Sequence, residues 1–205
     1  MQSNFCTALD GTQTTAQQKA QITMATQGEK ITNARTGQRM IFLKTGKETN
    51  GDLLEIDSFN PKTDTREPIH IHPKQESSAE VISGKLHFLI NGKQQIIGPG
   101  ERITIPAGVP HCFWNEDDTE AHSIQRFSPA LSIDEFFETF FALSRDNRLN
   151  EKGIPSFFHA SLIMLKHKND IRVTNPPWVI QLLTYYTLAP IGLLMGYRGD
   201  YISKK

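Results

Sequence analysis

The chain has 205 residues, enough for one ordinary domain with extensions. Lys and Arg number 22, as do Asp and Glu, so the formal net charge is zero at pH 7. This balance argues against a general nucleic-acid binder, which needs a surplus of cations on one face. A content of 38% apolar residues is sufficient for a packed core and excludes a chain that is disordered throughout.

The only two cysteines, Cys6 and Cys112, are too few for a disulfide framework and do not form a CxxC pair. No basic N-terminal segment followed by an apolar run is present, so no secretory signal is expected. We therefore expect reduced thiols and a cytoplasmic protein.

Residues 1–30 are predicted to form an N-terminal arm, because the sequence up to Gly28 is rich in Gln, Thr and Ala and nearly uncharged. Residues 31–128 then consist of short β-rich runs separated by turn residues, which indicates a sandwich or barrel. Asn91-Gly92 between two such runs is a strong hairpin signal. Predicted strands lie near residues 39–44, 51–59, 69–72, 79–83, 86–90, 95–97, 102–105, 111–114 and 122–127.

Residues 129–205 are predicted to form a helical C-terminal tail. Ser132 and Glu135 have the spacing of a capping box at the start of a helix, and Phe136, Phe137, Phe140 and Phe141 then form one apolar face. A second helix is expected over residues 156–166.

A third apolar stretch, Trp178–Gly196, follows Pro177 and has no charged residue. Pro190 is expected to break or kink a helix in it. Three environments remain open for this stretch: packing on the barrel or across a dimer interface, peripheral contact with a membrane, and a membrane span.

His70 and His72 occupy alternate positions of a predicted strand, so their imidazoles point to the same side, as metal chelation requires. The segment from Gly100 to Asn115 has the turn residues to deliver His111 at the start of a later strand. Together they would bring three histidines to one inner wall.

At these residues the sequence resembles the cupin superfamily. The second cupin motif, G-x5-P-x-G-x2-H-x3-N, is matched at every fixed position, and the first, H-x-H-x(3,4)-E-x6-G, at both histidines and the glycine. The resemblance implies a double-stranded β-helix, or jelly-roll, barrel with a short helical appendage, and a homodimer formed by pairing barrel edges. The matching residues are Gly100, Pro106, Gly108, His111 and Asn115 for the second motif, and His70, His72 and Gly84 for the first.

The first motif departs from the family at its acid. Counting back from Gly84, the carboxylate ligand should stand at position 77, which is Ser77, while Glu76 satisfies only the spacing from the histidines. Strand alternation turns Glu76 toward solvent unless the preceding loop rotates. Three arrangements remain open: a three-histidine site, a site with Glu76 or, less favoured, Gln75 as fourth ligand, and a degenerate barrel that holds no metal.

Such a site suits Fe, Mn, Ni, Cu or Zn, among which the ligand types do not distinguish. Ser77, Phe113 and His122 are candidate substrate-lining residues, and Glu76 is the only candidate proton-transfer group near the metal. The leading hypothesis is a metal-dependent enzyme of the dioxygenase type that acts on a small organic molecule. The alternative is a non-catalytic cupin module that binds a small molecule or metal.

Overall fold

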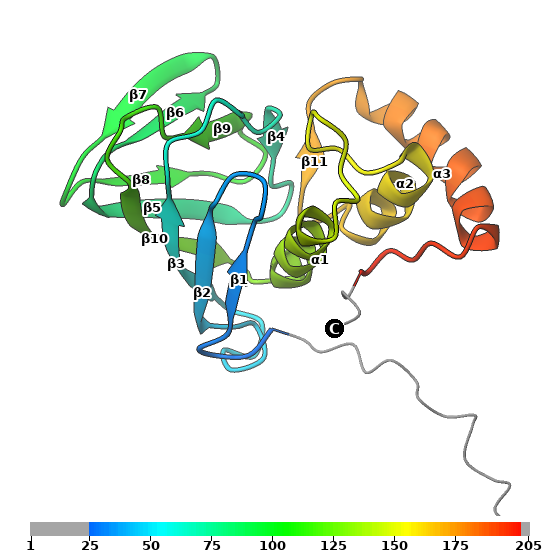
Figure 1. Cartoon of the computed structure of the whole chain (residues 1–205), viewed down its shortest axis with the longest axis horizontal. Helices are drawn as coiled ribbons and strands as arrows, with labels where there is room; N and C mark the ends of the chain where they lie inside the picture. Colours follow the sequence, from blue (N-terminus) through cyan, green and yellow to red (C-terminus); the bar gives the residue numbers. More distant parts are fainter. Residues whose placement is uncertain (1–24, 202–205) are drawn as a thin grey trace, which may run out of the picture.

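The computed structural model describes residues 25–201, in which two antiparallel β-sheets lie beside three helices (Figure 1). The helices are α1 (Ile133–Arg145), α2 (Phe157–Lys166) and α3 (Trp178–Leu194). The strands are β1 (Lys30–Thr32), β2 (Arg39–Lys44), β3 (Leu54–Asn60), β4 (His70–Ile71), β5 (Glu76–Ser83), β6 (Leu86–Ile90), β7 (Lys93–Ile97), β8 (Arg102–Ile105), β9 (His111–Trp114), β10 (Ala121–Ser128) and β11 (Arg172–Val173).

The first sheet has the order β1-β2-β3-β10-β5-β8, and the second has the order β11-β4-β9-β6-β7. This double-sheet arrangement agrees with the predicted jelly-roll class, and each predicted strand has a counterpart in it. The Asn91-Gly92 hairpin is confirmed: it joins β6 to β7, and both residues have positive φ angles, 47° and 77°.

Two apolar cores hold the molecule together. One lies between the facing sheets and contains side chains such as Val81 of β5 and Leu86 of β6. The other lies where β2, β3 and β10 pack against α1 and α2, and it includes Phe42, Phe127 and Ile163. The predicted apolar face of α1 therefore packs on the first sheet. This packing holds the helices against the strands.

The N-cap of α1 differs from its prediction. Ser132 makes no side-chain bond to its own helix; its hydroxyl instead donates to Asp170 Oδ2 at 2.8 Å. Glu135 pairs with Lys166 of α2 at 2.8 Å. The capping box was thus wrong, because tertiary partners on the segment after α2 compete with the local ones.

Two features of the C-terminal segment were also not predicted. α3 runs through Pro190, so the expected break is absent there, while the expected kink stays a prediction. In addition, β11 pairs with β4, with Val173 opposite His70. The C-terminal segment thus extends the sheet that carries the histidines.

No helix in residues 25–201 has both the length and the apolar character to cross a bilayer. The expected cytoplasmic location stays a prediction. Most of the predicted N-terminal arm, residues 1–24, lies outside the described residues, and the boundaries proposed at 30 and 128 also stay predictions.

Replacement of Gly84 should destabilise the fold strongly. Gly84 has φ +72°, and a Cβ atom there would lie 2.6 Å from the Glu120 carbonyl oxygen and 2.7 Å from Ala121 Cα. We expect Gly84→Ala to lower the free energy of unfolding by roughly 3 kcal/mol, measured by chemical denaturation. Gly92→Ala is the matched control, because Gly92 has φ +77° and open space around it; a cost of about 1 kcal/mol is expected. Equal costs at the two positions would contradict the close contact.

The carboxyl of Glu138 on α1 should make stability depend on pH. Burial, together with the negative charges of Glu29, Asp134 and Glu135, raises its pKa to about 8. Since the folded pKa exceeds the unfolded one, wild-type stability falls as the pH rises from about 4.5 through 8. We expect Glu138→Gln to be more stable than the wild type by roughly 2 kcal/mol at pH 9, and equally stable at pH 4.5, in denaturant titrations. A constant difference across this range would contradict the shift.

Candidate metal centre

Three histidines from the second sheet meet at one point. His70 begins β4 and pairs directly with His111, which begins β9, while His72 follows β4. One ring nitrogen from each lies within 4.8 Å of the others, and the ring centroids are 4.5–5.3 Å apart. The two motif segments are also joined by a hydrogen bond from Gly108 N to His72 O at 2.9 Å. The predicted convergence of the three imidazoles is thus present in the structure.

Backbone carbonyls fix the tautomer and the orientation of all three rings. A carbonyl can only accept a hydrogen bond, so each Nδ1 carries the proton and each Nε2 keeps its lone pair. This arrangement is the one that metal-ligating histidines typically have. The bonds run from His70 Nδ1 to Pro68 O at 3.0 Å, from His72 Nδ1 to Asp170 O at 2.7 Å and from His111 Nδ1 to Val109 O at 2.9 Å.

The three imidazoles are neutral at physiological pH. Burial lowers the pKa of His72 to about 4 and, with repulsion from the other two rings, lowers the pKa of His70 well below its usual value. Burial also lowers the pKa of His111. A cation therefore meets three lone pairs without competition from protons.

Asp170, between α2 and β11, ties the helical segment to the centre. While its carbonyl accepts from His72, its carboxylate accepts from the backbone N–H of Ser132 at 2.9 Å and lies 3.3 Å from His167 Nδ1. Burial alone would raise the pKa of Asp170, but hydrogen bonds from His167 and Ser132 lower it. The orientation of a candidate ligand thus depends on residues about 100 positions away, which the sequence motifs did not reveal.

The structure does not bring Glu76 into the cluster. Its side chain is exposed at the start of β5, opposite Ser128 of β10. Ser77 is 7% exposed and lines the same cavity as the histidines. The three-histidine arrangement is therefore the one that the described residues display.

Gln75, which directly precedes Glu76, has a polar side chain close to His72 of the histidine cluster. It is fully buried, and its Nε2 donates to Pro129 O at 2.9 Å and to Ala130 O at 2.8 Å. Its Oε1 is buried without a hydrogen-bond partner among residues 25–201, and the amide is near enough to raise the pKa of His72. A neutral oxygen without a partner beside three nitrogen donors fits a site for a divalent transition metal.

The three histidines form part of the wall of a cavity of about 680 Å³. Apolar side chains dominate the rest of the wall, and they come from both sheets and all three helices. Ser77 and Phe113 lie in its wall, and their predicted contact with a substrate stays a prediction. Its phenylalanines are Phe88, Phe113, Phe127, Phe136, Phe137, Phe140, Phe141 and Phe157.

His122 does not line this cavity. Its ring stacks on Phe59 with the centroids 4.4 Å apart, and its Nε2 is hydrogen-bonded to Asp57 Oδ1. The alternation along β10 buries Ala121 and Ser123, so it turns His122 to the other face of the sheet. Its predicted position at the cavity was therefore wrong by one step of the strand period.

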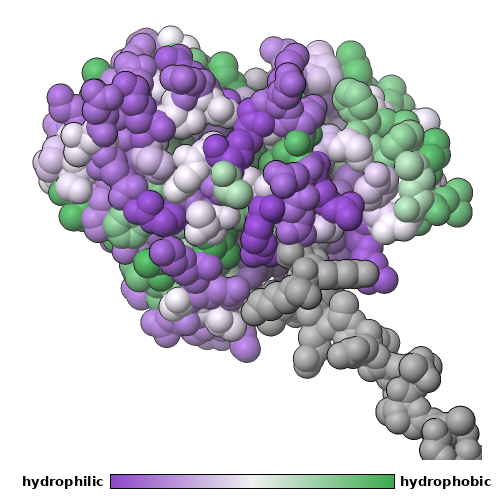
Figure 2. All heavy atoms as spheres, viewed as in Figure 1, coloured by the Kyte–Doolittle hydropathy of each residue, from purple (hydrophilic) through white to green (hydrophobic). Residues whose placement is uncertain are grey.

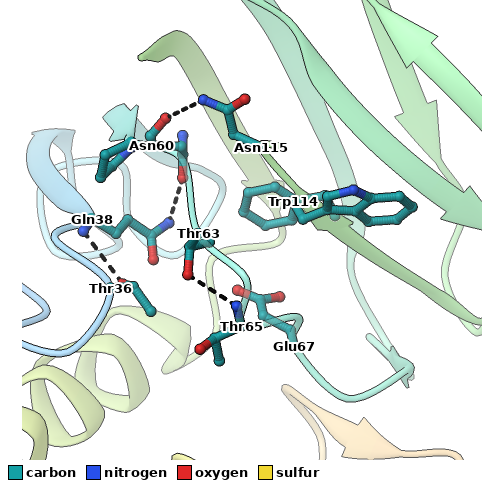
Figure 3. Close-up of a pocket in the computed structure, with 10 residues that line it drawn as sticks. Thr36, Gln38, Asn60, Thr63, Thr65, Glu67, Trp114 and Asn115 are labelled. Atoms are coloured by element: carbon teal, nitrogen blue, oxygen red, sulfur yellow. Dashed lines mark hydrogen bonds between the residues drawn. The ribbon is translucent and has the colours of Figure 1, made fainter. Parts of the chain in front are cut away.

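Glu67 is a chemically relevant residue that the sequence analysis missed. It lines both the large cavity and an adjoining polar pocket of about 40 Å³, toward which its carboxylate points (Figure 3). The residue is exposed, but protein atoms on several sides of its carboxyl desolvate it and raise its pKa to about 7. Glu67 lies in the loop between β3 and β4, where no strand or helix periodicity exists to predict its direction. The pocket also has Gln38, Thr63 and Thr65 in its wall.

Residues 58–124 match the family model described as "Cupin domain". Quercetin 2,3-dioxygenase of Bacillus subtilis is 31% identical over 71 residues, which are 35% of this chain and 21% of that protein. The "probable oxidoreductase virH" of Hypocrea virens is 30% identical, with 65% of this chain and 65% of that protein covered. The chain thus spans 21% and 65% of the lengths of these two relatives.

Solved structures with a similar arrangement include KdgF from Halomonas sp., with a TM-score of 0.39, 20% identity and coverage of 45% of this chain and 81% of that chain. An RmlC-like cupin from Shewanella frigidimarina has a TM-score of 0.42 and 22% identity, with 49% and 83% covered. Both cupin motifs, the two antiparallel sheets and the family model agree on one assignment. Residues 58–124 of this chain form a cupin domain.

Proposed function

We propose that this protein is a metal-dependent enzyme of the dioxygenase type that acts on a small, largely apolar organic molecule. The observation that carries the proposal is the presence of three neutral, oriented imidazoles in the wall of a cavity of about 680 Å³. This volume lies within the usual range for sites of small organic ligands. The names of the two relatives, a dioxygenase and a probable oxidoreductase, support the same reaction class.

His70, His72 and His111 would hold the metal through Nε2, and the buried Oε1 atom of Gln75, whose amide interacts with His72, is a candidate for a further oxygen ligand. A divalent ion such as Fe, Mn, Ni, Cu or Zn would supply a Lewis acid there and, if it is redox-active, a site for oxygen chemistry. The exposed side chain of Glu76 would have to turn inward to bind the metal, so the proposal depends on the three histidines.

The remaining residues define the substrate class. The phenylalanines of β6, β9, β10, α1 and α2 make the wall largely apolar and favour a flat apolar body. Since the three ligands are neutral, a bound cation would keep its full charge and would attract an anionic or chelating oxygen group. We therefore infer a substrate with an apolar or aromatic body and a pair of adjacent oxygen atoms at one end.

Glu67 is our candidate for a group that transfers a proton to or from such a substrate, because it lines the same cavity as the histidines. A pKa of about 7 lets its carboxyl exist in both protonation states near neutral pH. We expect Glu67→Gln to lower kcat about 100-fold and to remove an ionisation near pH 7 from the pH–rate profile, with metal content unchanged. Asp52→Asn, at an exposed site, should behave as the wild type. A pH profile that is the same in Glu67→Gln and in the wild type would remove Glu67 from the mechanism.

The function is tested by oxygen uptake of metal-loaded protein with a panel of catechols, flavonols and β-diketones. The proposal expects that at least one member causes oxygen consumption in the wild type and none in His111→Ala, with the oxidised product identified by mass spectrometry. Tight binding of a panel member without consumption of oxygen or ligand would instead favour a non-catalytic binding module.

A further inference from the structure

α3 presents an apolar surface that no described residue covers. Eight large apolar residues on it, or at its C-cap, are 43–89% exposed. They gather along the outer edge of the molecule, where Figure 2 shows a patch of hydrophobic side chains over α3. The eight are Val179, Ile180, Leu183, Tyr186, Ile191, Leu193, Leu194 and Met195.

The opposite face of α3 is already in use. Gln181, Ala189 and Gly192 are buried, and Gly192 packs so closely on α2 that a Cβ atom would lie 2.8 Å from Phe158 O. Gln181 and Tyr185 line the large cavity. The inner face of α3 therefore forms one wall of the cavity, and no described residue packs on its apolar outer face.

The outer face has the spacing of a helix-pairing seam. Val179, Leu183, Tyr186, Pro190 and Leu193 are all exposed and follow one another at alternating intervals of four and three residues. This is the heptad spacing that packs one helix along another.

Area and charge favour a second copy of this chain over a bilayer. Side chains of this size have roughly 150–200 Å² each to bury. Six of the eight lie on or beside the seam, and at their observed exposures they offer about 650 Å², which is within the usual contribution of one partner to a stable interface. The six are Val179, Ile180, Leu183, Tyr186, Leu193 and Leu194. Helices that bind membrane surfaces carry Lys or Arg on their polar flank, whereas residues 178–197 contain no charged residue.

From these observations we infer that the protein is a homodimer in which the α3 helices of two chains pair along this seam. The interface differs from the barrel-edge pairing that the sequence resemblance implied. It would support the cavity wall from outside, because the same helix forms both surfaces.

The test is the oligomeric state of the full chain, measured by sedimentation velocity at protein concentrations of about 1 to 50 µM. We expect a dimer for the wild type and a dissociation constant at least about 100-fold higher for Leu183→Glu. Because Leu183 is 66% exposed, this variant should still fold and keep the wild-type circular dichroism spectrum. Val179→Glu, with the same exposure of 66%, should act in the same way.

The matched control is Ile96→Glu on β7, an exposed isoleucine on the edge strand of the second sheet. It should leave the dimer intact. A monomeric wild type, or a dimer that Ile96→Glu disrupts and Leu183→Glu does not, would overturn the inference. Flotation of the wild type with phosphatidylcholine–phosphatidylserine vesicles, lost in Leu183→Glu, would also overturn it in favour of a membrane surface.

Discussion

Replacement of His111 by alanine is expected to abolish tight binding of a divalent transition metal. The variant removes one of three nitrogen donors and leaves two, so we expect the affinity to fall by about 100-fold or more. Metal content after purification without chelators, followed by calorimetric titration, measures the effect. The residual affinity should be similar in His70→Ala and His72→Ala, because all three imidazoles have the same kind of carbonyl anchor.

His159→Phe provides the control for this loss. His159 is also a buried histidine, but it stacks on Tyr197 in the helical segment and is not part of the cluster. A phenylalanine keeps the ring contact, so metal content should equal that of the wild type. If His159→Phe lost the metal and His111→Ala kept it, the centre would have been assigned to the wrong residues.

Replacement of Ala160 by tryptophan is expected to prevent ligand binding without disturbing the metal. Ala160 lies on α2 and lines the large cavity from the helical side. A large ring there would occupy space that an apolar ligand needs. We expect the affinity for dihydroxynaphthalene, a planar apolar diol, to fall by at least about 100-fold in the metal-loaded protein, as followed by absorbance titration.

Ala160→Ser, which changes the volume little, should bind the same probe as the wild type does. Metal content should be unchanged in both variants, which separates loss of the cavity from loss of the centre. Unaltered probe binding in Ala160→Trp would show that the ligand occupies another part of the molecule.

The sequence predicted the sheets and the histidine cluster because both depend on local rules. Alternation places His70 and His72 on one side of a strand, and the glycines and prolines of the second motif deliver His111 to the neighbouring strand. These signals need no knowledge of what lies across the molecule.

The features that the sequence analysis predicted wrongly or missed depend mostly on contacts with residues far away in the sequence. Ser132 has a sequence-local partner in Glu135 but binds Asp170. The β11 pairing and the anchoring of His72 by the Asp170 carbonyl likewise join segments about 100 residues apart. Glu67 lies in a loop, where no periodicity indicates which way a side chain points.

Anomalous diffraction from crystals grown with a divalent transition metal tests the central claim most directly. The account predicts one strong peak within about 2.0–2.2 Å of the Nε2 atoms of His70, His72 and His111, on the side of the large cavity. Three separated rings without a peak between them, or a peak coordinated by other residues, would contradict it.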